Sequence, residues 1–282
     1  MTNKELRNIF NPDGSKLRKD QLELLEMVQH VADICEHNNI KWWLSSGTLL
    51  GAVRHDGFIP WDDDIDIVLP HDDYKRLYEI LLNENNEEYV LHCHKSDENY
   101  IARFAKYRKR KGNVSGINPV ATNCYKWQGI GFDIFKLQKN SYIGALVAAK
   151  LFKLCMIFNW KIKCAKLRHV YSRIALFVFT LSSAIIYYPL LIFRKKGEYH
   201  YQAGTGWPQH VFFEYDFYPL KTHKFEHFNF PIPNNSDNYL RNNFGDYMKL
   251  PNLNSLHIHS KEYRDEIYPR LKKFLDKKNN YE

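Results

Sequence analysis

An acidic segment in which carboxylates alternate with aliphatic residues constrains this chain most. In the sequence DIDIVL, Asp64 and Asp66 alternate with Ile65, Ile67 and Leu69. Side chains of a β-strand point alternately to its two faces, so this period predicts a strand with both carboxylates on one face. Neighbouring carboxylates repel each other unless a cation lies between them. Their oxygen atoms suit Mg²⁺, or Mn²⁺, particularly where substrate phosphates complete the coordination shell.

A third carboxylate belongs to a second predicted strand, Ile130–Leu137. There Phe132 and Ile134 are expected in the core, and Asp133 faces the opposite way. We expect Asp133 to complete a metal site or to accept a proton from an acceptor hydroxyl. Asp62, just before the first strand, is a further candidate for substrate binding.

A glycine turn precedes the acidic strand. The sequence predicts a short strand over Lys41–Ser45, then a turn at Ser46 and Gly47 into a helix over Thr48–His55. The free N–H groups at a helix start bind phosphate, and glycine lets a ligand approach the backbone closely. The candidate phosphate- and substrate-binding residues in this segment are Ser46, Gly47, Thr48, Gly51 and Arg54. Arg54 is a candidate because a guanidinium can hold a phosphate through two hydrogen bonds.

Lys106 and Arg108, at the end of a predicted strand over Tyr100–Tyr107, are further candidates for donor contacts. A solvated basic strand end explains these two residues equally well.

A calcium-binding EF-hand is an alternative for the acidic segment. Asp62, Asp64 and Asp66 would occupy loop positions 1, 3 and 5. However, Ile67 would stand where the loop needs glycine, and Asp73 where glutamate is usual. The alternation of apolar residues also favours a strand.

Taken together, these segments resemble the LicD/fukutin family. The similar segments are Leu44–His55, Gly57–Asp66, Phe132–Phe135, Phe217–Leu220, Tyr239–Leu240, Phe244–Met248 and Leu250–Pro251. The first two form a long and specific motif. The resemblance covers most of the chain outside residues 134–197.

The resemblance implies a nucleotidyltransferase fold and an enzyme that moves a phosphorylated alcohol from a nucleotide donor to a glycan hydroxyl. Bacterial members are similar to phosphocholine transferases that use CDP-choline, and other members handle ribitol phosphate. The resemblance implies Asp64 and Asp66 as metal ligands, with Asp133 as the third carboxylate. The acceptor would be a cell-surface glycan such as lipopolysaccharide or teichoic acid.

The chain departs from the family pattern near its C-terminal segments. Phe244 stands where tyrosine is frequent, and Pro251 is followed by Asn252 rather than by a second proline. His259 is the best match to a family histidine, but the arginine that usually precedes it is missing. These departures concern donor and acceptor contacts and leave the expected metal site unchanged.

The fold class expected from these patterns is α+β, a nucleotidyltransferase-like mixed sheet with flanking helices. We expect one catalytic domain over residues 1–282 with a helical, basic and apolar insertion at about 140–197. Helices are also predicted over Lys16–Asn38 and Asp72–Leu82, near Asn238–Phe244, and over Lys261–Lys277.

The expected insertion lies in a window without acidic residues. Residues 134–197 contain twelve lysines or arginines and no aspartate or glutamate, although the whole chain carries a net charge of only +8. Residues 174–193 are twenty residues without a charge, enough to span a bilayer as a helix. A single crossing would separate Asp64 and Asp133 from the family-like segments after residue 217. We therefore expect the insertion to lie at an anionic membrane surface, with Lys150 and Lys153 toward the headgroups. A buried helical pair is the alternative.

Other functions remain open at this point. A nucleotidyltransferase that leaves the nucleotide on its product would use similar carboxylates. The basic window also suggests nucleic acid, but its long aliphatic runs disfavour that partner, and intact carboxylates disfavour a non-catalytic glycan-binding protein. Five scattered cysteines fit a reducing compartment, and the N-terminus has no apolar stretch typical of a signal peptide. We expect a cytoplasmic protein peripheral to the inner face of the plasma membrane.

Overall fold

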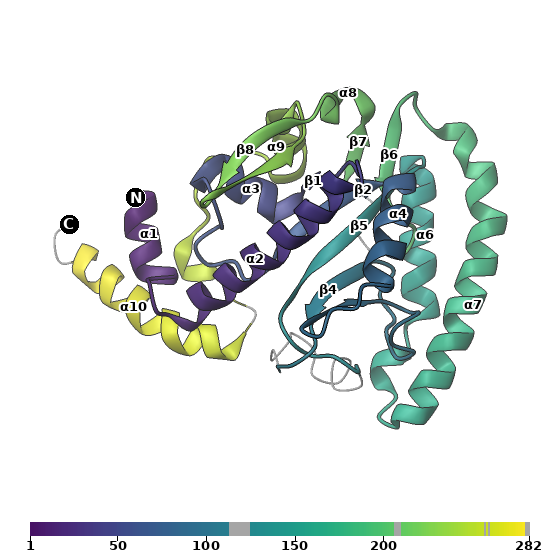
Figure 1. Ribbon diagram of the computed structural model, residues 1–282, viewed down its shortest axis with the longest axis horizontal. Helices are drawn as coiled ribbons and strands as arrows, with labels where there is room; N and C mark the ends of the chain where they lie inside the picture. The colour runs from purple at the N-terminus through teal and green to yellow at the C-terminus, as the bar shows by residue number, and fades with distance from the viewer. Residues whose placement is uncertain (113–124, 206–209, 257, 259, 280–282) are drawn as a thin grey trace.

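A mixed sheet forms the centre of the molecule (Figure 1). The structure is a computed structural model that describes residues 1–112, 125–205, 210–256, 258 and 260–279. Five of the seven strands follow the order β1 (Trp43–Leu44), β2 (Asp66–Pro70), β5 (Gly131–Lys139), β4 (Ala105–Lys109) and β3 (Tyr89–His92). β6 (Glu198–Tyr201) pairs with the end of β5, and β7 (Val211–Phe213) pairs with β6. β2 and β5 run parallel, whereas the other pairs are antiparallel. The expected α+β class is confirmed.

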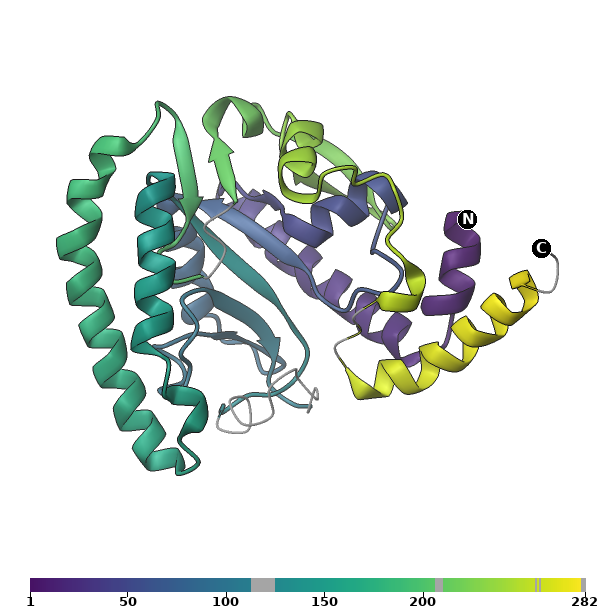
Figure 2. The same ribbon diagram turned by 180° about the vertical axis from the view of Figure 1, so that it is seen from behind.

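Two helices cover one face of this sheet. They are α2 (Lys16–His37) and α4 (His71–Leu82), which lie in front of the strands in Figure 1. α2 begins where the Ser15 side chain accepts a hydrogen bond from the N–H of Arg18, and it ends at Asn38. Its apolar side, including Leu24, Leu25 and Val28, is fully buried because it packs into the core of the sheet. Seen from behind, no helix of the described residues lies across the opposite face of β2 and β5 (Figure 2).

A second group of elements packs beside β1. It comprises α3 (Ser46–His55), α8 (Glu214–Phe217), the hairpin of β8 (Lys221–Phe225) and β9 (Phe228–Ile232), and α9 (Ser236–Phe244). β9 contacts β1, and α3 contacts both β8 and α9. Segments far apart in sequence therefore join one core, which includes Trp43 stacked on Phe217 at a centroid distance of 5.0 Å.

The N- and C-terminal helices pack against each other. α1 (Asn3–Phe10) contacts α10 (Lys261–Asn279), and both meet the start of α2. Leu6, Phe10, Leu17 and Ile267 form a smaller apolar cluster there.

A helical hairpin forms one side of the molecule. It consists of α6 (Tyr142–Cys155), the short 3-10 turn η1 (Asn159–Lys161), α7 (Ala165–Leu190) and a closing turn η2 (Leu191–Phe193). The hairpin is inserted between two paired strands, because Leu137 of β5 lies opposite Tyr201 of β6. The hairpin lies within residues 140–197. α7 continues through Ser182 and Ser183, where the sequence permits a bend, and includes Pro189 near its end.

Several element boundaries differ from expectation. β2 begins at Asp66 rather than Asp64, and β4 begins at Ala105 rather than Tyr100. α1, β3 and the β8–β9 hairpin were not anticipated. The first strand of the hairpin, KTHKF, has no apolar alternation, although FNFPI of the second does, and Glu226 at φ 58° lies in the turn between them. Tertiary packing of aromatic residues thus overrides the weak local pattern.

Candidate active site

Three charged side chains lie side by side on the face of the sheet opposite to α2 and α4. Asp66 of β2 is in register with Asp133 of β5, and Asp133 is in register with Lys106 of β4. Residues directly opposite each other in neighbouring strands project to the same face. The Lys106 ammonium makes an ion pair with the Asp133 carboxylate, and these side chains are 25% and 12% exposed. The structure therefore brings together two predicted carboxylates and one predicted cation.

Two further carboxylates come from the segment just before β2. The backbone carbonyl of Asp62 accepts a hydrogen bond of 2.8 Å from Gln21 of α2, which fixes this segment against the sheet. Burial raises the pKa of Asp62 well above its ordinary value, and the charges of Asp64 and Asp63 raise it further. Asp62 and Asp64 are thus close neighbours in a partly buried place.

The pKa of Asp66 shows how closely the acids gather. Burial raises it well above its ordinary value, and the charges of Asp64, Asp133 and Asp62 add to this effect in that order. Lys106 opposes the shift and offsets part of the charge. Hard oxygen donors that repel one another fit a divalent cation, which would relieve the repulsion. Within the described ranges, no group of three or more His, Cys, Asp or Glu side chains is placed to hold a metal ion.

The glycine turn is fastened to the beginning of β2. The Asp66 N–H donates a hydrogen bond of 2.8 Å to the Thr48 hydroxyl, and the Ser45 N–H donates to the Asp66 carbonyl at 3.0 Å. Ser46 has φ 49°, which turns the chain sharply into α3. A Cβ at Gly47 would lie 3.1 Å from a carboxylate oxygen of Asp62. Ser46, Gly47 and Thr48 thus stand beside the acidic cluster.

Two buried tyrosines complete this corner, and sequence reasoning missed their role. The Tyr201 hydroxyl lies 2.8 Å from the Ser45 hydroxyl and 3.1 Å from that of Ser46. The Tyr239 hydroxyl accepts a hydrogen bond of 3.4 Å from the Ser46 N–H. Tyr239 lies in one of the segments that resemble the LicD/fukutin family, so the sequence offered a signal for its role. Tyr201 follows the insertion, and no sequence motif marks it.

Gly51 and Arg54 make contacts inside the protein. A Cβ at Gly51 would lie 2.5 Å from the Gly57 carbonyl oxygen, so glycine allows α3 to pack on the following loop. Arg54 donates a hydrogen bond of 2.7 Å to the Tyr247 carbonyl and one of 2.8 Å to His55. These contacts join α3 to the C-terminal family-like segment.

The remaining predicted residues have different surroundings. Arg108 donates a hydrogen bond of 2.6 Å to the Gly129 carbonyl, and burial lowers its pKa. It is two residues from Lys106 on β4, so it shares the same face. His259 lies outside the described residues.

Comparisons with known proteins match this part of the chain. Residues 39–144 match the family model described as LicD/FKTN/FKRP, nucleotidyltransferase domain. This range contains the turn and every carboxylate of the cluster. The lipopolysaccharide cholinephosphotransferase LicD of Haemophilus influenzae is 39% identical over 88 residues, which are 31% of this chain and 32% of that protein. The human ribitol 5-phosphate transferase FKRP is 43% identical over 44 residues, 16% of this chain and 9% of that protein.

The alignment thus spans about a third of the LicD protein and less of FKRP. Residues 39–144 of this chain are therefore similar to the LicD/FKTN/FKRP nucleotidyltransferase domain.

Proposed function

We propose that this chain is a metal-dependent phosphotransferase that moves a phosphorylated alcohol from a cytidine nucleotide to a glycan hydroxyl. Phosphocholine from CDP-choline is the favoured group, because the relative with the longest match among those described above is a cholinephosphotransferase. The acceptor would be a cell-surface glycan such as lipopolysaccharide or teichoic acid.

The register of Asp66, Asp133 and Lys106 carries this proposal. Alternating acids on one exposed strand are common, whereas here two carboxylates are aligned on parallel neighbouring strands with a lysine beside them, which supports a site for a charged substrate. Asp64 and Asp66 are proposed to hold Mg²⁺, or Mn²⁺, with Asp133 as the third carboxylate. The cation would neutralise charge that grows on the donor phosphates in the transition state.

The chain's own groups are assigned as follows. The turn of Ser46, Gly47 and Thr48 would position the nucleotide phosphate, because its backbone is close to Asp62 and Asp66. Lys106 would contact a donor phosphate, and Asp133 would receive the proton of the acceptor hydroxyl. Attack of that oxygen on the donor phosphorus would release CMP.

Product analysis with purified protein tests the proposal. CDP-choline, CDP-ribitol and CDP-glycerol are each incubated with Mg²⁺ and a glycan acceptor, and the products are separated by chromatography and weighed by mass spectrometry. CMP release with a glycan heavier by one phosphoalcohol is the expected result. Pyrophosphate release from CTP, with nucleotide on the glycan, would show a nucleotidyltransferase instead. No binding of any CDP-alcohol would defeat the cytidine-donor assignment.

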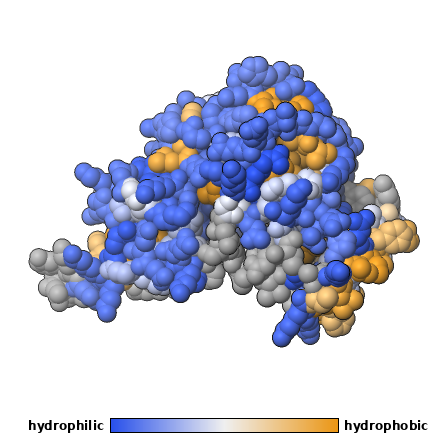
Figure 3. Space-filling model, turned by 60° about the horizontal axis from the view of Figure 1, so that its bottom comes forward, coloured by the Kyte–Doolittle hydropathy of each residue, from blue (hydrophilic) through white to orange (hydrophobic). Residues whose placement is uncertain are grey.

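We propose that the protein acts at a membrane surface, because one side of α7 is exposed and apolar. Its exposed side is an apolar stripe at three- and four-residue spacing: Leu167, Val170, Ile174, Phe177, Leu181 and Ile185. Its inner side carries the buried Arg168, Ser172, Ala175 and Phe179. Figure 3 shows apolar side chains gathered on the side of the molecule where Figure 1 places α7. Such an exposed patch marks an interaction surface.

Basic residues flank this stripe at both ends. Lys161, Lys163 and Lys166 are exposed before it, and Lys195 and Lys196 are exposed after it. An apolar stripe between clusters of lysine fits the interface of an anionic leaflet.

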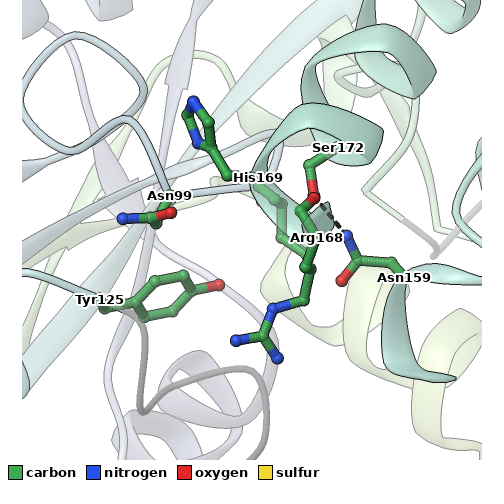
Figure 4. Close-up of a pocket in the computed structure, with 7 residues that line it drawn as sticks. Asn99, Tyr125, Asn159, Arg168, His169 and Ser172 are labelled. Carbon is green, nitrogen blue, oxygen red and sulfur yellow. Dashed lines mark hydrogen bonds between the residues drawn. The ribbon is translucent and has the colours of Figure 1, made fainter. Parts of the chain in front are cut away.

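α7 is long and apolar enough to cross a bilayer over Lys166–Ile186, but it is attached to the domain along its length. At its start, Arg168 and His169 meet Asn99 and Tyr125 around a gap of about 10 Å³, room for no more than one water (Figure 4). Midway, Phe179 lies 5.3 Å beneath the Arg103 guanidinium, and at its end the Leu190 carbonyl accepts a hydrogen bond from Ser141. A helix held in this way fits a position on the membrane surface. We propose the cytoplasmic face of the plasma membrane.

A further inference from the structure

A second cavity lies on the other side of Phe104 from the acidic cluster. Its volume is about 590 Å³, within the range of roughly 300–1,000 Å³ usual for small-ligand sites. It is lined by residues 101–104 before β4, by one side of α6, and by Gly204 and Thr205 after β6. In Figure 2, α6 borders the face of the sheet that carries no covering helix.

The wall formed by α6 is apolar and continuous. Its apolar lining residues on α6 recur at three-residue spacing, Leu146, Ala149 and Phe152, and Met156 and Ile157 of the turn that follows continue the lining. From Leu146 to Cys155, where α6 ends, the helix rises about 14 Å, so the cavity is elongated along α6 and is called the trough below. Such a shape fits a hydrocarbon chain better than a compact sugar or nucleotide, which would leave its polar groups unpaired.

Cations are present at this trough, and none of its lining residues is acidic. Lys150 and Lys153 line it and are exposed, so they stand at its rim. Arg103 lines it as well, and its Nε is buried without a hydrogen-bond partner. Arg103 lies over the Phe179 ring at 5.3 Å, and in the described part of the chain it forms no ion pair. A partly buried guanidinium without a carboxylate favours an incoming anion.

We propose that this trough binds the hydrocarbon chain of a lipid-linked acceptor, with Arg103, Lys150 and Lys153 on the phosphate that joins lipid to glycan. The assignment of the lipid to the acceptor rests on the proposed function. The binding of a hydrocarbon chain with a phosphate head group does not rest on it. A single-chain lipid phosphate fits one trough on one helix face better than a two-chain bilayer phospholipid.

Phe104 connects the trough to the carboxylates. Its ring lines the cavity, lies 4.7 Å from the Phe135 ring, and is 5.7 Å from the Lys106 ammonium. Lys106 in turn pairs with Asp133. A glycan attached to a phosphate at the trough would therefore begin one side chain away from the reacting groups.

Calorimetry with farnesyl phosphate, below the concentration at which it forms micelles and without metal or donor, tests the inference. We expect saturable binding that Ala149→Phe weakens at least tenfold, because the new ring fills the trough. Leu154→Phe is the matched control, since Leu154 is 65% exposed on the same helix and does not line the cavity. Lys150→Gln with Lys153→Gln changes only exposed side chains and should weaken farnesyl phosphate binding about tenfold while leaving farnesol binding unchanged.

Calorimetric titrations with other compounds distinguish the possible ligands. Inorganic phosphate alone should bind far more weakly than farnesyl phosphate. Tighter binding of diheptanoyl phosphatidylglycerol would mean a bilayer-lipid site and overturn the acceptor assignment. The inference would be overturned if farnesyl phosphate did not bind. It would also be overturned if a folded Ala149→Phe variant and the lysine double variant both bound farnesyl phosphate as tightly as the wild type. Failure of CMP release with intact farnesyl phosphate binding would count against the proposed function alone.

Discussion

Asp66 and Asp133 lie opposite each other on the parallel strands β2 and β5, and Lys106 pairs with Asp133 from the next strand. The sheet thus aligns two acids that the chain separates by more than sixty residues. Burial and three other carboxylates raise the pKa of Asp66, and Lys106 opposes this shift. Clustered charges with strongly shifted pKa values are typical of binding and catalytic sites.

Removing Asp64 or Asp66 tests the metal assignment. We expect Asp64→Ala and Asp66→Ala each to lower transfer at least a thousandfold, because each deletes a proposed ligand, and Asp133→Ala to be nearly as severe. The wild type should gain thermal stability on addition of Mg²⁺, and the variants should lose this gain. Asp72→Ala, an exposed carboxylate on α4, is the control and should behave as wild type. Near-normal turnover by Asp66→Ala would remove this centre from the mechanism.

Lys106→Met separates metal binding from donor binding. The substitution removes a positive charge beside Asp133, so Mg²⁺ should bind about tenfold more tightly, equivalent to about 1.4 kcal/mol. Donor affinity should fall, since the proposed phosphate contact is lost. Titrations of Mg²⁺ and of CDP-choline would measure both. Unchanged donor affinity would mean that Lys106 only neutralises Asp133.

The two glycines of α3 should respond differently to alanine. At Gly47 the new Cβ would press on the Asp62 carboxylate at 3.1 Å, so Gly47→Ala should weaken CDP-choline binding with little loss of stability. At Gly51 the Cβ would meet the Gly57 carbonyl at 2.5 Å, so Gly51→Ala should destabilise the fold by about 1–3 kcal/mol. Thermal unfolding and calorimetry distinguish the two effects. A stability loss at Gly47 equal to that at Gly51 would argue for a purely structural turn.

Parts of this site could be predicted from sequence and parts could not. The alternation of Asp66 and Asp133 with apolar residues is local, so it predicted on which face of the sheet these two side chains lie, whereas Asp64 precedes β2. The register between Asp66 and Asp133 depends on strand pairing across α4, β3 and β4, and no local pattern encodes it. Tyr201 reaches Ser45 only because β6 pairs with β5 after a long insertion.

The insertion shows the same limit of prediction from sequence. Its apolar and basic composition predicted a helical segment, but only the packing of α7 on α6 shows which side of α7 stays exposed. Lys150 and Lys153 were expected toward headgroups because they share one helix face. In the structure that face lines the trough beside Phe104.

A buried ion pair between Arg18 and Glu226 holds the loop that precedes the acidic cluster. This pair leads to a prediction of how the stability of the protein depends on pH. Arg18 of α2 donates to Glu226 at 2.7 Å, and the Glu226 carboxylate also accepts from the Phe58 N–H. Burial acts to raise the pKa of Glu226, but hydrogen bonding and charge from Arg18 outweigh it, and the pKa is lowered. The stability from this pair is therefore present above the unfolded pKa, near 4.3, and is lost as pH falls through the folded value.

Arg18→Ala should accordingly cost about 3–5 kcal/mol at neutral pH, because it removes the buried partner of Glu226 and leaves this carboxylate with the more exposed Arg7 at 3.9 Å. The difference from wild type should shrink as Glu226 becomes protonated below about pH 4. Denaturant unfolding at pH 7 and at pH 3.5 measures both quantities. Arg241→Ala, which removes an ion pair with Asp237 whose two side chains are 61% and 56% exposed, is the control and should cost less than about 1 kcal/mol. An equal loss at both pH values would show that Arg18 acts through packing rather than charge.

The exposed stripe of α7 should determine whether the protein binds membranes. Wild-type protein should float with anionic liposomes at low salt and float less at high salt, because screening weakens the attraction of the flanking lysines. Replacing Ile174, Phe177 and Leu181 together with serine should reduce the bound fraction at least tenfold. These side chains are 59%, 69% and 55% exposed, so their loss removes apolar area available to lipid while the fold keeps its core. The matched control replaces Leu22 and Met248, exposed apolar residues outside the hairpin, with serine and should float as wild type does. Protein that stays at the bottom of the gradient without detergent, or a triple variant that floats normally, would rule out α7 as the membrane-binding surface.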